Sequence, residues 1–599
     1  GRTGRPQDLD AAIAAYEDAV ARTPADSPDR AGYLNNLGNG LSDRYGRTGR
    51  PQDLDAAIAA YTAALDGINE SFQAVAVGYI TNAQRQWAGL YARATTALLA
   101  AGRPAEALAV AEGSKSRLLT LLMSRGDLPA PPVIPAALVD AERAAAARLS
   151  AIDAAALGDH NRAGSEPGEV IRQRSAARAA LVAELRAAWQ AMAELGPEAA
   201  EYVSLRRGDR PTAAGLARLA GELPAGTALL SLFDTGEAGE RRRVLLFLLR
   251  AGAAGPVVLE AALDPDALYY DYLANYEEEV LDPRRRRALR ALGRPLTGRW
   301  RGLGRPLLGP LLPHLDGIDH LIIAPVGVYH QLPLHALWIG PADSGAAEPG
   351  PAGSTLLDHC AVSYIPALGL LERLVGAPVA PGDLSGRSAV FGYTDADPTT
   401  ERGAREREIF LGEAAAVAGR LGVEPLLDDA ATGAALEAAT ARPLRRLHLS
   451  CHGYFNGQDA LASGVLLAAG AGGSAVYTAR QFMTHRLPVE LVTLSACQTA
   501  ISGSLGGDEM AGLSMGLLSA GARSLLLGQW SVNAQTTEKL MVWFYALLDG
   551  AGGPRATKAE TLRRVMLAFR DGRILLPGKG FDPADPYYWA PFVLVGNWR

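Results

Sequence analysis

The chain has 599 residues, of which 48% are hydrophobic and 20% charged, and its formal net charge is −6. This length predicts several domains, each long enough to bury a core of its own. The small net charge gives no general attraction to nucleic acid or to an anionic membrane, so we do not expect the chain to bind nucleic acid directly.

Cysteine usage and apolar runs indicate the compartment. The three cysteines, Cys360, Cys451 and Cys497, are too few for a disulfide framework and fit a reducing cytoplasm. Apolar runs such as 245–249 are of strand length, well below the ~18 residues of a membrane span, so we expect no membrane insertion. The chain begins without Met and inside a repeat, so we expect a piece of a longer protein or a mature product.

The first part of the chain is repetitive. Residues 1–16 recur without change as 46–61, and Leu9, Ile13 and Tyr16 lie at helical spacing. A second helical stretch, 33–41, lies between the two copies. Paired helices at a fixed period are typical of a solenoid, and the pattern resembles tetratricopeptide repeats in a long variant. Such a region predicts a bound regulatory protein or peptide.

The remainder of the chain changes from helical to alternating patterns. A proline cluster at 129–135 precedes an Ala-, Arg- and Glu-rich region, 136–197, which predicts a helical hairpin broken near 158–168. From 228 onward, apolar runs alternate with helical patterns, which predicts a mostly parallel sheet flanked by helices. The expected strands are 228–233, 244–249, 320–324, 360–365, 388–391, 447–450, 491–495 and 523–527, with helices at 413–420, 510–519 and 536–548.

These signals predict a multidomain chain. We expect helical repeats of the tetratricopeptide kind over 1–125, in an array that is truncated here, and a helical linker or hairpin over 126–205. An α/β domain with a mostly parallel sheet should occupy 206–599. The predicted fold class is therefore an α-helical solenoid followed by an α/β domain.

A histidine and a cysteine each follow a short apolar run near the end of the chain. His452 and Cys497 are 45 residues apart, which is enough for a crossover between two neighbouring strands. In open parallel sheets, functional residues collect just past the carboxyl ends of the strands. A thiol beside an imidazole is a nucleophile with its base. The pair therefore predicts acyl transfer, with Cys497 as nucleophile and His452 as acid/base.

Residues beside this pair are candidates for supporting roles. The backbone N–H groups of Gly453 and Cys497 could form an oxyanion hole, which commonly supplies about 3 kcal/mol of transition-state stabilisation. Ser495, Asp508 and Glu509 are candidate substrate-pocket residues, although the two carboxylates equally fit a cap for the helix expected from 510.

Two further residues lie on the strand that leads to His452. His448 lies four residues before His452 and should point the same way, so it is a candidate to orient the catalytic ring, with a packed structural role as the alternative. Cys451 should point to the opposite face. Without a close-spaced set of Cys and His residues, we expect no metal site.

Motifs around the pair follow one another in a fixed order over roughly 210–599. The segments are 322–334, 447–453, 494–499, 507–513, 528–532, 539–545 and 588–596. Together they resemble the CHAT family of caspase-like cysteine peptidases, which tetratricopeptide repeats commonly precede. The resemblance implies a caspase-like fold, endoproteolytic cleavage of a protein substrate by His452 and Cys497, and no metal or organic cofactor.

The resemblance also bears on specificity and setting. Relatives often carry acidic residues after the segment matching 530–532, whereas this chain has Asn-Ala-Gln at 533–535, which weakens any expectation of Arg or Lys specificity. Family analogy points to bacterial defence or programmed cell death, with gasdermins or CRISPR-linked proteins as candidate substrates. Two alternatives stay open: a non-catalytic scaffold made of a solenoid and a degenerate caspase-like module, and an esterase or transferase that uses the same pair.

Overall fold

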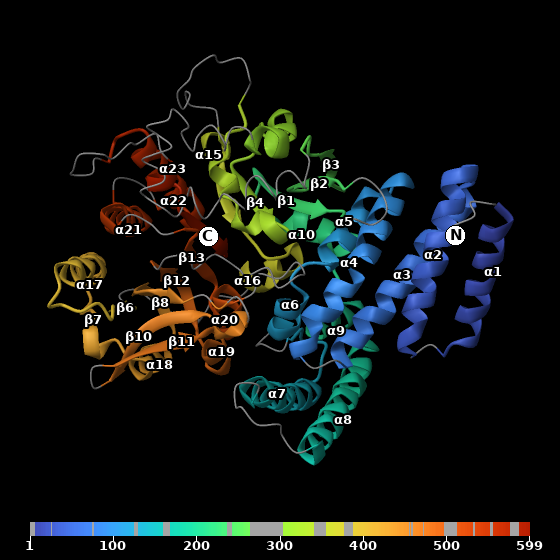
Figure 1. Ribbon diagram of the computed structural model, residues 1–599, viewed down its shortest axis with the longest axis horizontal. Helices are drawn as coiled ribbons and strands as arrows, with labels where there is room; N and C mark the ends of the chain where they lie inside the picture. The colour runs from blue at the N-terminus through green and yellow to red at the C-terminus, as the bar shows by residue number, and fades with distance from the viewer. Residues whose placement is uncertain are drawn as a thin grey trace. The chain divides into compact units, whose positions relative to one another are not determined.

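The computed structural model forms two compact units (Figure 1). The first comprises Gly1–Ala217 and Thr235–Arg242, and the second comprises Arg218–Asp234 and Arg243–Arg599. No helix among the described residues is both long and apolar enough to cross a lipid bilayer. The described residues are 6–24, 27–74, 77–124, 130–159, 168–236, 242–263, 303–340, 355–375, 387–454, 456, 459–470, 473–495, 512–530, 534–551, 555–574 and 586–599.

The first unit is helical, which confirms the sequence prediction for this region. The two copies of the repeat form the starts of α1 (Pro6–Arg22) and α3 (Pro51–Ala74), and α2 (Pro28–Thr48) lies between them in the chain. Each helix begins with a proline, where the missing N–H breaks no helical hydrogen bond. Gly49 ends α2 with a φ of 66° and donates its N–H to the carbonyl of Tyr45. That these helices form a tetratricopeptide solenoid stays a prediction.

Among the described residues, six further helices lie wholly within the first unit. The region 136–197, where a hairpin is expected, contains two long helices; the predicted break near 158–168 lies mostly outside the described residues, which omit 160–167. The predicted domain boundaries at 125/126 and 205/206 also stay predictions. The helices are α4 (Val77–Ala100), α5 (Pro104–Gly113), α6 (Arg117–Ser124), α7 (Ala136–Asp159), α8 (Gly168–Ala193) and α9 (Pro197–Arg207).

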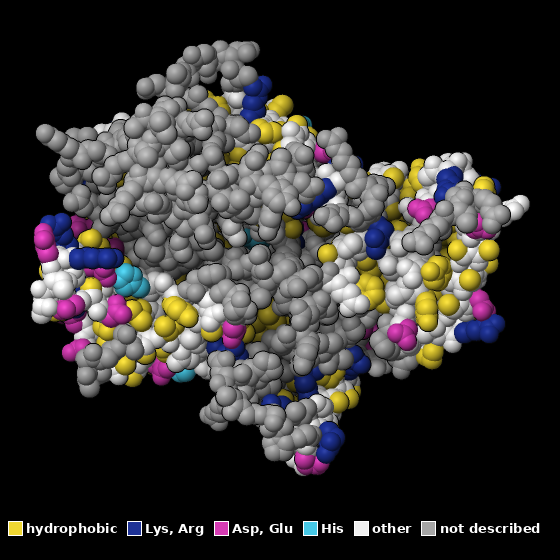
Figure 2. Space-filling model, in the orientation of Figure 1, with side chains coloured by type: hydrophobic (Ala, Val, Ile, Leu, Met, Phe, Trp, Pro, Cys, Tyr) yellow, Lys and Arg dark blue, Asp and Glu magenta, His cyan; other side chains and the backbone are white. Residues whose placement is uncertain are grey.

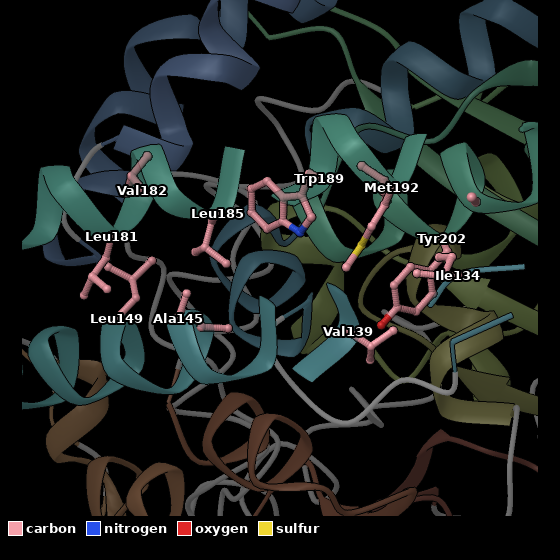
Figure 3. Packing of buried hydrophobic residues seen from close by; sticks show 13 residues of the cluster. Ile134, Val139, Ala145, Leu149, Leu181, Val182, Leu185, Trp189, Met192 and Tyr202 are labelled. Atoms are coloured by element: carbon pink, nitrogen blue, oxygen red, sulfur yellow. The ribbon is translucent and has the colours of Figure 1, made fainter. Parts of the chain in front are cut away.

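A hydrophobic core joins α7, α8 and α9 (Figure 3). Leu149 of α7 lies against Leu181 of α8 in this core. A charged pair is buried beside it: Arg206 donates to the Glu142 carboxylate at 2.9 and 2.8 Å, and the Trp189 indole donates to it at 3.2 Å. Both charged side chains are only 1% exposed. Because water cannot solvate them, each charge is compensated by the other.

The second unit is built on a sheet whose strands lie in the order β3-β2-β1-β4-β5-β14-β13-β12-β8-β6-β7. Neighbouring strands are parallel except at β3–β2, β2–β1 and β13–β14. This confirms the α/β domain with a mostly parallel sheet. The strands are β1 (Thr227–Asp234), β2 (Val244–Arg250), β3 (Val257–Glu260), β4 (His320–Ala324), β5 (Ala361–Tyr364), β6 (Ser388–Gly392), β7 (Leu426–Leu427), β8 (Leu444–Ser450), β12 (Val489–Leu494), β13 (Ser524–Gly528) and β14 (Phe592–Gly596).

Helices pack on this sheet, and two of them cover the part that carries the site. α17 (Glu401–Leu421) contacts β6 and β8, and α21 (Ala534–Leu548) packs against α17. They contain the predicted helices 413–420 and 536–548. The other helices are α10 (Ala213–Glu222), α15 (Leu356–His359), α16 (Leu371–Val375), α18 (Gly433–Thr440), α19 (Ala479–Thr484), α20 (Leu513–Ala520), α22 (Lys558–Arg570) and α23 (Pro586–Trp589), with 3-10 turns at Gly309–His314, Gly327–Gln331, Leu334–Ala336, Leu368–Leu370, Asp428–Ala430 and Ala460–Ala462.

A small antiparallel sheet follows β8 in the chain. It consists of β9 (Gly453–Tyr454), β10 (Gly464–Gly470) and β11 (Gly473–Thr478), in the order β11-β10-β9. β9 therefore lies at an edge and begins directly after His452. On the face shown in Figure 2, Lys and Arg side chains are interspersed with Asp and Glu among the described residues.

Candidate active site

Three strand ends meet where the site is expected. β8 pairs in parallel with β6 on one side and with β12 on the other, so their carboxyl ends share one edge of the sheet. Thr394 lies two residues past β6, and His452 lies two residues past β8. Past β12, the Ser495 N–H donates to the Leu449 carbonyl at 3.0 Å, so the parallel pairing continues beyond the strand.

The ring of His452 contacts a carboxylate and an aromatic ring, both from α17. Its Nε2 lies 2.8 Å from Glu406 Oε1, and its centroid lies 4.5 Å from that of Phe410. The Thr394 hydroxyl donates to the same Glu406 oxygen at 2.8 Å and lies 3.4 Å from Nε2. A carboxylate only accepts, so the imidazole Nε2–H is the donor. With Nε2 held in this way, Nδ1 is the nitrogen left to act as a base.

The Glu406 carboxyl is ionised, as an acceptor of the hydrogen bond from His452 should be. Burial acts to raise the pKa of its carboxyl, but hydrogen bonds from His452 and Thr394 outweigh burial and hold the pKa below its usual value. Its side chain is 28% exposed, and that of His452 is 34% exposed. The carboxylate therefore stays ionised beside a ring that solvent or a substrate can reach.

The backbone N–H of Gly453, directly after His452, points away from the small antiparallel sheet. Leu466 donates its N–H to the His452 carbonyl at 2.9 Å, and Gly453 faces Val465 in the register of β9 and β10. The bond joins the residue after Val465 to the residue before Gly453, so Gly453 and Val465 are a non-hydrogen-bonded pair of the antiparallel ladder. The Gly453 N–H therefore points away from β10. It points to the edge of β9 that pairs with no other described strand, which suits a donor to a substrate carbonyl.

Several predicted site residues lie outside the described residues. These are Cys497, Asp508 and Glu509, together with Asn533 of the specificity argument. Ser495 is described: it is 3% exposed and follows β12 directly. Its hydroxyl has no hydrogen-bond partner among the described residues. Its role in a substrate pocket stays a prediction.

His448 lies in the same row of side chains as His452, but its ring faces other groups. It is fully buried, with Nδ1 at 3.2 Å from the Tyr545 hydroxyl and Nε2 at 3.3 Å from Glu413 Oε1. The ring of His448 thus contacts side chains of α17 and α21 and not the ring of His452. The residue that hydrogen-bonds the ring of His452 is Glu406.

The two described cysteines are unsuited to nucleophilic chemistry. Burial raises the pKa of both Cys360 and Cys451 to about 12, so neither forms a thiolate near neutral pH. Cys451 has its side chain on the face of β8 opposite to His448 and Ser450. Within the described ranges, no group of three or more His, Cys, Asp and Glu side chains could hold a metal ion.

Sequence reasoning missed the partners of His452. Thr394 follows the correctly predicted strand 388–391, and a polar residue just past a parallel strand is a signal that could have found it. Glu406 lies in the run 405–408, which alternates Arg and Glu and is typical of a solvated helix face. Nothing local distinguishes it from Glu408, because the choice depends on how α17 is rotated on the sheet.

A comparison with protein families gives a match over the second part of the chain. The family model described as the CHAT domain matches residues 298–597, half of the chain. A search of curated proteins finds no match.

Similarities to solved structures are weaker. The Arg specific cysteine proteinase gingipain R (RGPB) aligns with a TM-score of 0.32 and 10% identity, over 49% of this chain and 67% of that chain. A chain of the Saccharomyces cerevisiae separase–securin complex aligns with a TM-score of 0.44 and 9% identity, over 100% of this chain. This chain spans 49% of the yeast chain. Both TM-scores are too low to establish a common fold.

The family match covers β4 to β14 and includes every strand that borders the candidate site. From this match over residues 298–597, the chain belongs to the CHAT domain family.

Proposed function

We propose that this protein is a caspase-like cysteine endopeptidase in which His452 is the acid/base and Cys497 the nucleophile. The observation that carries the proposal is the hydrogen bond between His452 Nε2 and Glu406 at the shared edge of β6, β8 and β12. A base held by a third group beside a nucleophile is the arrangement that nucleophilic catalysis requires. Cys497 lies two residues beyond Ser495, whose backbone N–H donates a hydrogen bond to the Leu449 carbonyl of β8.

In the acylation step, the Cys497 thiol gives its proton to His452 Nδ1 while sulfur attacks the scissile carbonyl carbon. The resulting oxyanion is stabilised by the N–H groups of Gly453 and Cys497, in the manner of an oxyanion hole. The C–N bond then breaks, and the leaving amine takes the proton from Nδ1. Glu406 accepts the Nε2–H bond throughout and stabilises the imidazolium that forms.

In the deacylation step, a water molecule attacks the thioester carbon and gives a proton to Nδ1. The C–S bond breaks, the proton on Nδ1 returns to the Cys497 sulfur, and the product leaves as a carboxylic acid that loses its remaining proton to solvent. Protein, water and substrate account for every proton, so the mechanism requires no metal or organic cofactor.

Alkylation of the cysteines tests this assignment directly. Cys360 and Cys451 serve as internal controls because burial raises the pKa of each thiol to about 12. We expect iodoacetamide to label Cys497 at least about tenfold faster than either control in the wild type, and this preference to be lost in His452→Ala. Mass spectrometry of the labelled peptides measures the three rates.

The outcomes separate the competing functions. Equally slow labelling of all three cysteines would contradict the proposal and favour a non-catalytic scaffold. If labelling depends on His452 and a peptide library is not cleaved, while ester substrates are turned over, the same pair serves an esterase or transferase. Co-expression of wild type or Cys497→Ala with the products of neighbouring genes then identifies the protein substrate, since only the wild type should cleave it.

The helical region supplies the regulation in this proposal. The repeats 1–16 and 46–61 form equivalent helix starts, which supports a tetratricopeptide-like surface that binds a regulatory protein or peptide. The proposed setting is the cytoplasm, in bacterial defence or programmed cell death, with a gasdermin or a CRISPR-linked protein as candidate substrate. A pull-down with residues 1–125 present or deleted, followed by cleavage assays, tests whether the bound partner controls activity.

A further inference from the structure

Helix α17 carries two of the described side chains that contact the ring of His452, in addition to Thr394 past β6. Glu406 lies 2.8 Å from Nε2, and Phe410, one turn later, packs on the ring with centroids 4.5 Å apart. The position of α17 along β8 therefore sets the position of the imidazole. An apolar interface alone does not fix that position well, because a helix shifted by one turn presents a similar surface after ~5.4 Å.

Two buried polar residues join α17 to β8 beneath this contact. The Ser450 hydroxyl lies 2.9 Å from the carbonyl oxygen of Phe410 and 3.1 Å from Glu413 Oε2. Ser450 is fully buried and Glu413 is 3% exposed. Ser450 precedes His452 by two residues, so its bonds connect the strand to the turn of helix that carries Phe410.

The same carboxylate extends the connection to the next strand. Glu413 Oε1 lies 3.3 Å from His448, which lies 3.2 Å from the Tyr545 hydroxyl. Tyr545 donates to the Thr493 hydroxyl at 2.7 Å. Thr493 belongs to β12 and precedes Cys497 by four residues. Close contacts thus run from α17 through β8 and α21 to the strand that leads to the cysteine: hydrogen bonds at Ser450, His448–Tyr545 and Tyr545–Thr493, and a 3.3 Å contact without hydrogen-bond geometry between His448 and Glu413.

We infer that Ser450 and Glu413 are positioning residues that set α17 in register with β8 and thereby hold Glu406 and Phe410 against His452. The inference rests on the proposed peptidase function, in which the ring of His452 must present Nδ1 to Cys497. Productive geometry has to be held within ~0.5 Å, and buried hydrogen bonds are directional contacts that can impose it. Neither residue touches the substrate or the reacting atoms, so both act through α17.

A matched pair of serines tests the inference. Ser524 is also fully buried, and its hydroxyl donates to the Asn597 carbonyl at 2.7 Å in β13, away from the contacts of His452. Ser450→Ala and Ser524→Ala each remove one buried hydroxyl of this kind, so their melting temperatures should fall by similar amounts. We expect Ser450→Ala to lower kcat and the rate of Cys497 alkylation about tenfold with KM within about twofold, and Ser524→Ala to keep the wild-type rates.

A second comparison uses Glu413. Glu413→Gln keeps an oxygen that can accept from Ser450, whereas Glu413→Leu removes it. We expect Glu413→Gln to retain most of the alkylation rate and Glu413→Leu to lose about tenfold. If Ser450→Ala does not fold, the two Glu413 variants still test whether the Ser450–Glu413 hydrogen bond positions α17.

The readouts distinguish failure of the inference from failure of the proposed function. If alkylation of Cys497 depends on His452 but Ser450→Ala matches Ser524→Ala, and the two Glu413 variants match each other, the positioning role is overturned and the peptidase proposal stands. If Cys497 in the wild type is no more reactive than in His452→Ala, both are overturned. A rate loss confined to Ser450→Ala and Glu413→Leu supports the positioning role.

Discussion

Glu406 and His452 are 46 residues apart in the chain, and their side chains meet across 2.8 Å at the carboxyl edge of the sheet. The bond also distinguishes the two ring nitrogens, since among the described residues Nε2 has hydrogen-bond partners and Nδ1 has none. The base in the proposed mechanism is therefore defined by a residue on α17 rather than by β8 alone.

Replacement of Glu406 should slow the chemistry more than it weakens substrate binding. Glu406→Gln keeps the size of the side chain and loses the charge that stabilises the imidazolium. Loss of a charge-assisted bond of this kind corresponds to a fall in kcat of about tenfold with little change in KM. Glu408→Gln, an exposed position on the same helix, is the control. Steady-state kinetics on a cleaved peptide checks the prediction, and equal kcat values for the two variants would contradict it.

Acid should destabilise the second unit through two buried histidines. Burial lowers the pKa of His320 to about 3 and that of His335 to about 4, so both rings are neutral in the folded protein. An unfolded histidine takes up a proton near pH 6.5, so the stabilisation from the neutral rings is complete above that pH. It is lost as pH falls from there toward the folded values, by up to about 1.4 kcal/mol per pH unit for each ring.

Urea unfolding of the full chain between about pH 7 and pH 5 measures this slope. The variants His320→Gln and His335→Gln remove one titrating ring each, so each should show a shallower dependence on pH than the wild type. His485→Gln is the control, because this side chain is 40% exposed. Parallel curves for all variants would show that the buried rings do not control acid stability.

Asp549 should be important for stability because it compensates a buried arginine. Its carboxylate lies 3.0 and 2.5 Å from the two terminal nitrogens of Arg446, whose side chain is 4% exposed. Burial acts to raise the pKa of Asp549, but Arg446 outweighs it and holds the pKa below its usual value. The stabilisation is thus present at neutral pH and is lost as pH falls through the lowered pKa.

Asp549→Asn should lower the free energy of unfolding by about 2 kcal/mol, since it leaves the Arg446 charge largely uncompensated. Asp571→Asn is the control: Asp571 pairs with Arg570 and Arg573 but is 39% exposed, and exposed pairs contribute little. Urea midpoints of both variants measure the difference. Equal midpoints would mean that solvent already compensates Arg446.

In the first unit, the Glu142–Arg206 pair provides the corresponding test. Arg206→Met should destabilise this unit by about 3 kcal/mol or more, because it leaves a buried carboxylate without its cation. The double variant Glu142→Leu/Arg206→Met removes both charges and should recover most of that loss. Glu184→Gln breaks an ion pair with Arg148 in which both side chains are about half exposed, so its effect should be small. Thermal unfolding followed by helical circular dichroism measures all three, and a double variant no better than Arg206→Met would contradict the prediction.

The sequence was most informative where structure is local and apolar. Buried parallel strands are nearly continuous apolar runs, so 388–391, 447–450 and 491–495 were found, and with them the edge where His452 lies. β14 was missed as a strand although Phe592–Gly596 is an apolar run of strand length; its place between β5 and β13 depends on partners far away in the chain. β10 and β11 were missed because glycine and alanine dilute their strand signal.

The site could be predicted only in part for a related reason. The spacing of His452 and Cys497 from their strands indicated the pair, since strand direction places both at one edge. The partner Glu406 depends on the rotation of α17, which is set by buried contacts of Phe410 and Glu413 with β8. No pattern within the helix encodes that rotation. Cys497, Asp508 and Glu509 lie outside the described residues, so their predicted roles stay predictions.

Along β8, Arg446, His448 and Ser450 share one face with His452 beyond the strand, while Leu447, Leu449 and Cys451 line the other. Insertion or deletion of one residue inside β8 would exchange these two rows, turn the leucines toward Glu413 of α17 and Asp549 just past α21, and aim His452 away from Glu406. The surrounding loops should therefore tolerate an insertion or deletion much better than this strand does. The number of residues in β8 is therefore a requirement of the site, because it decides which side chains face α17.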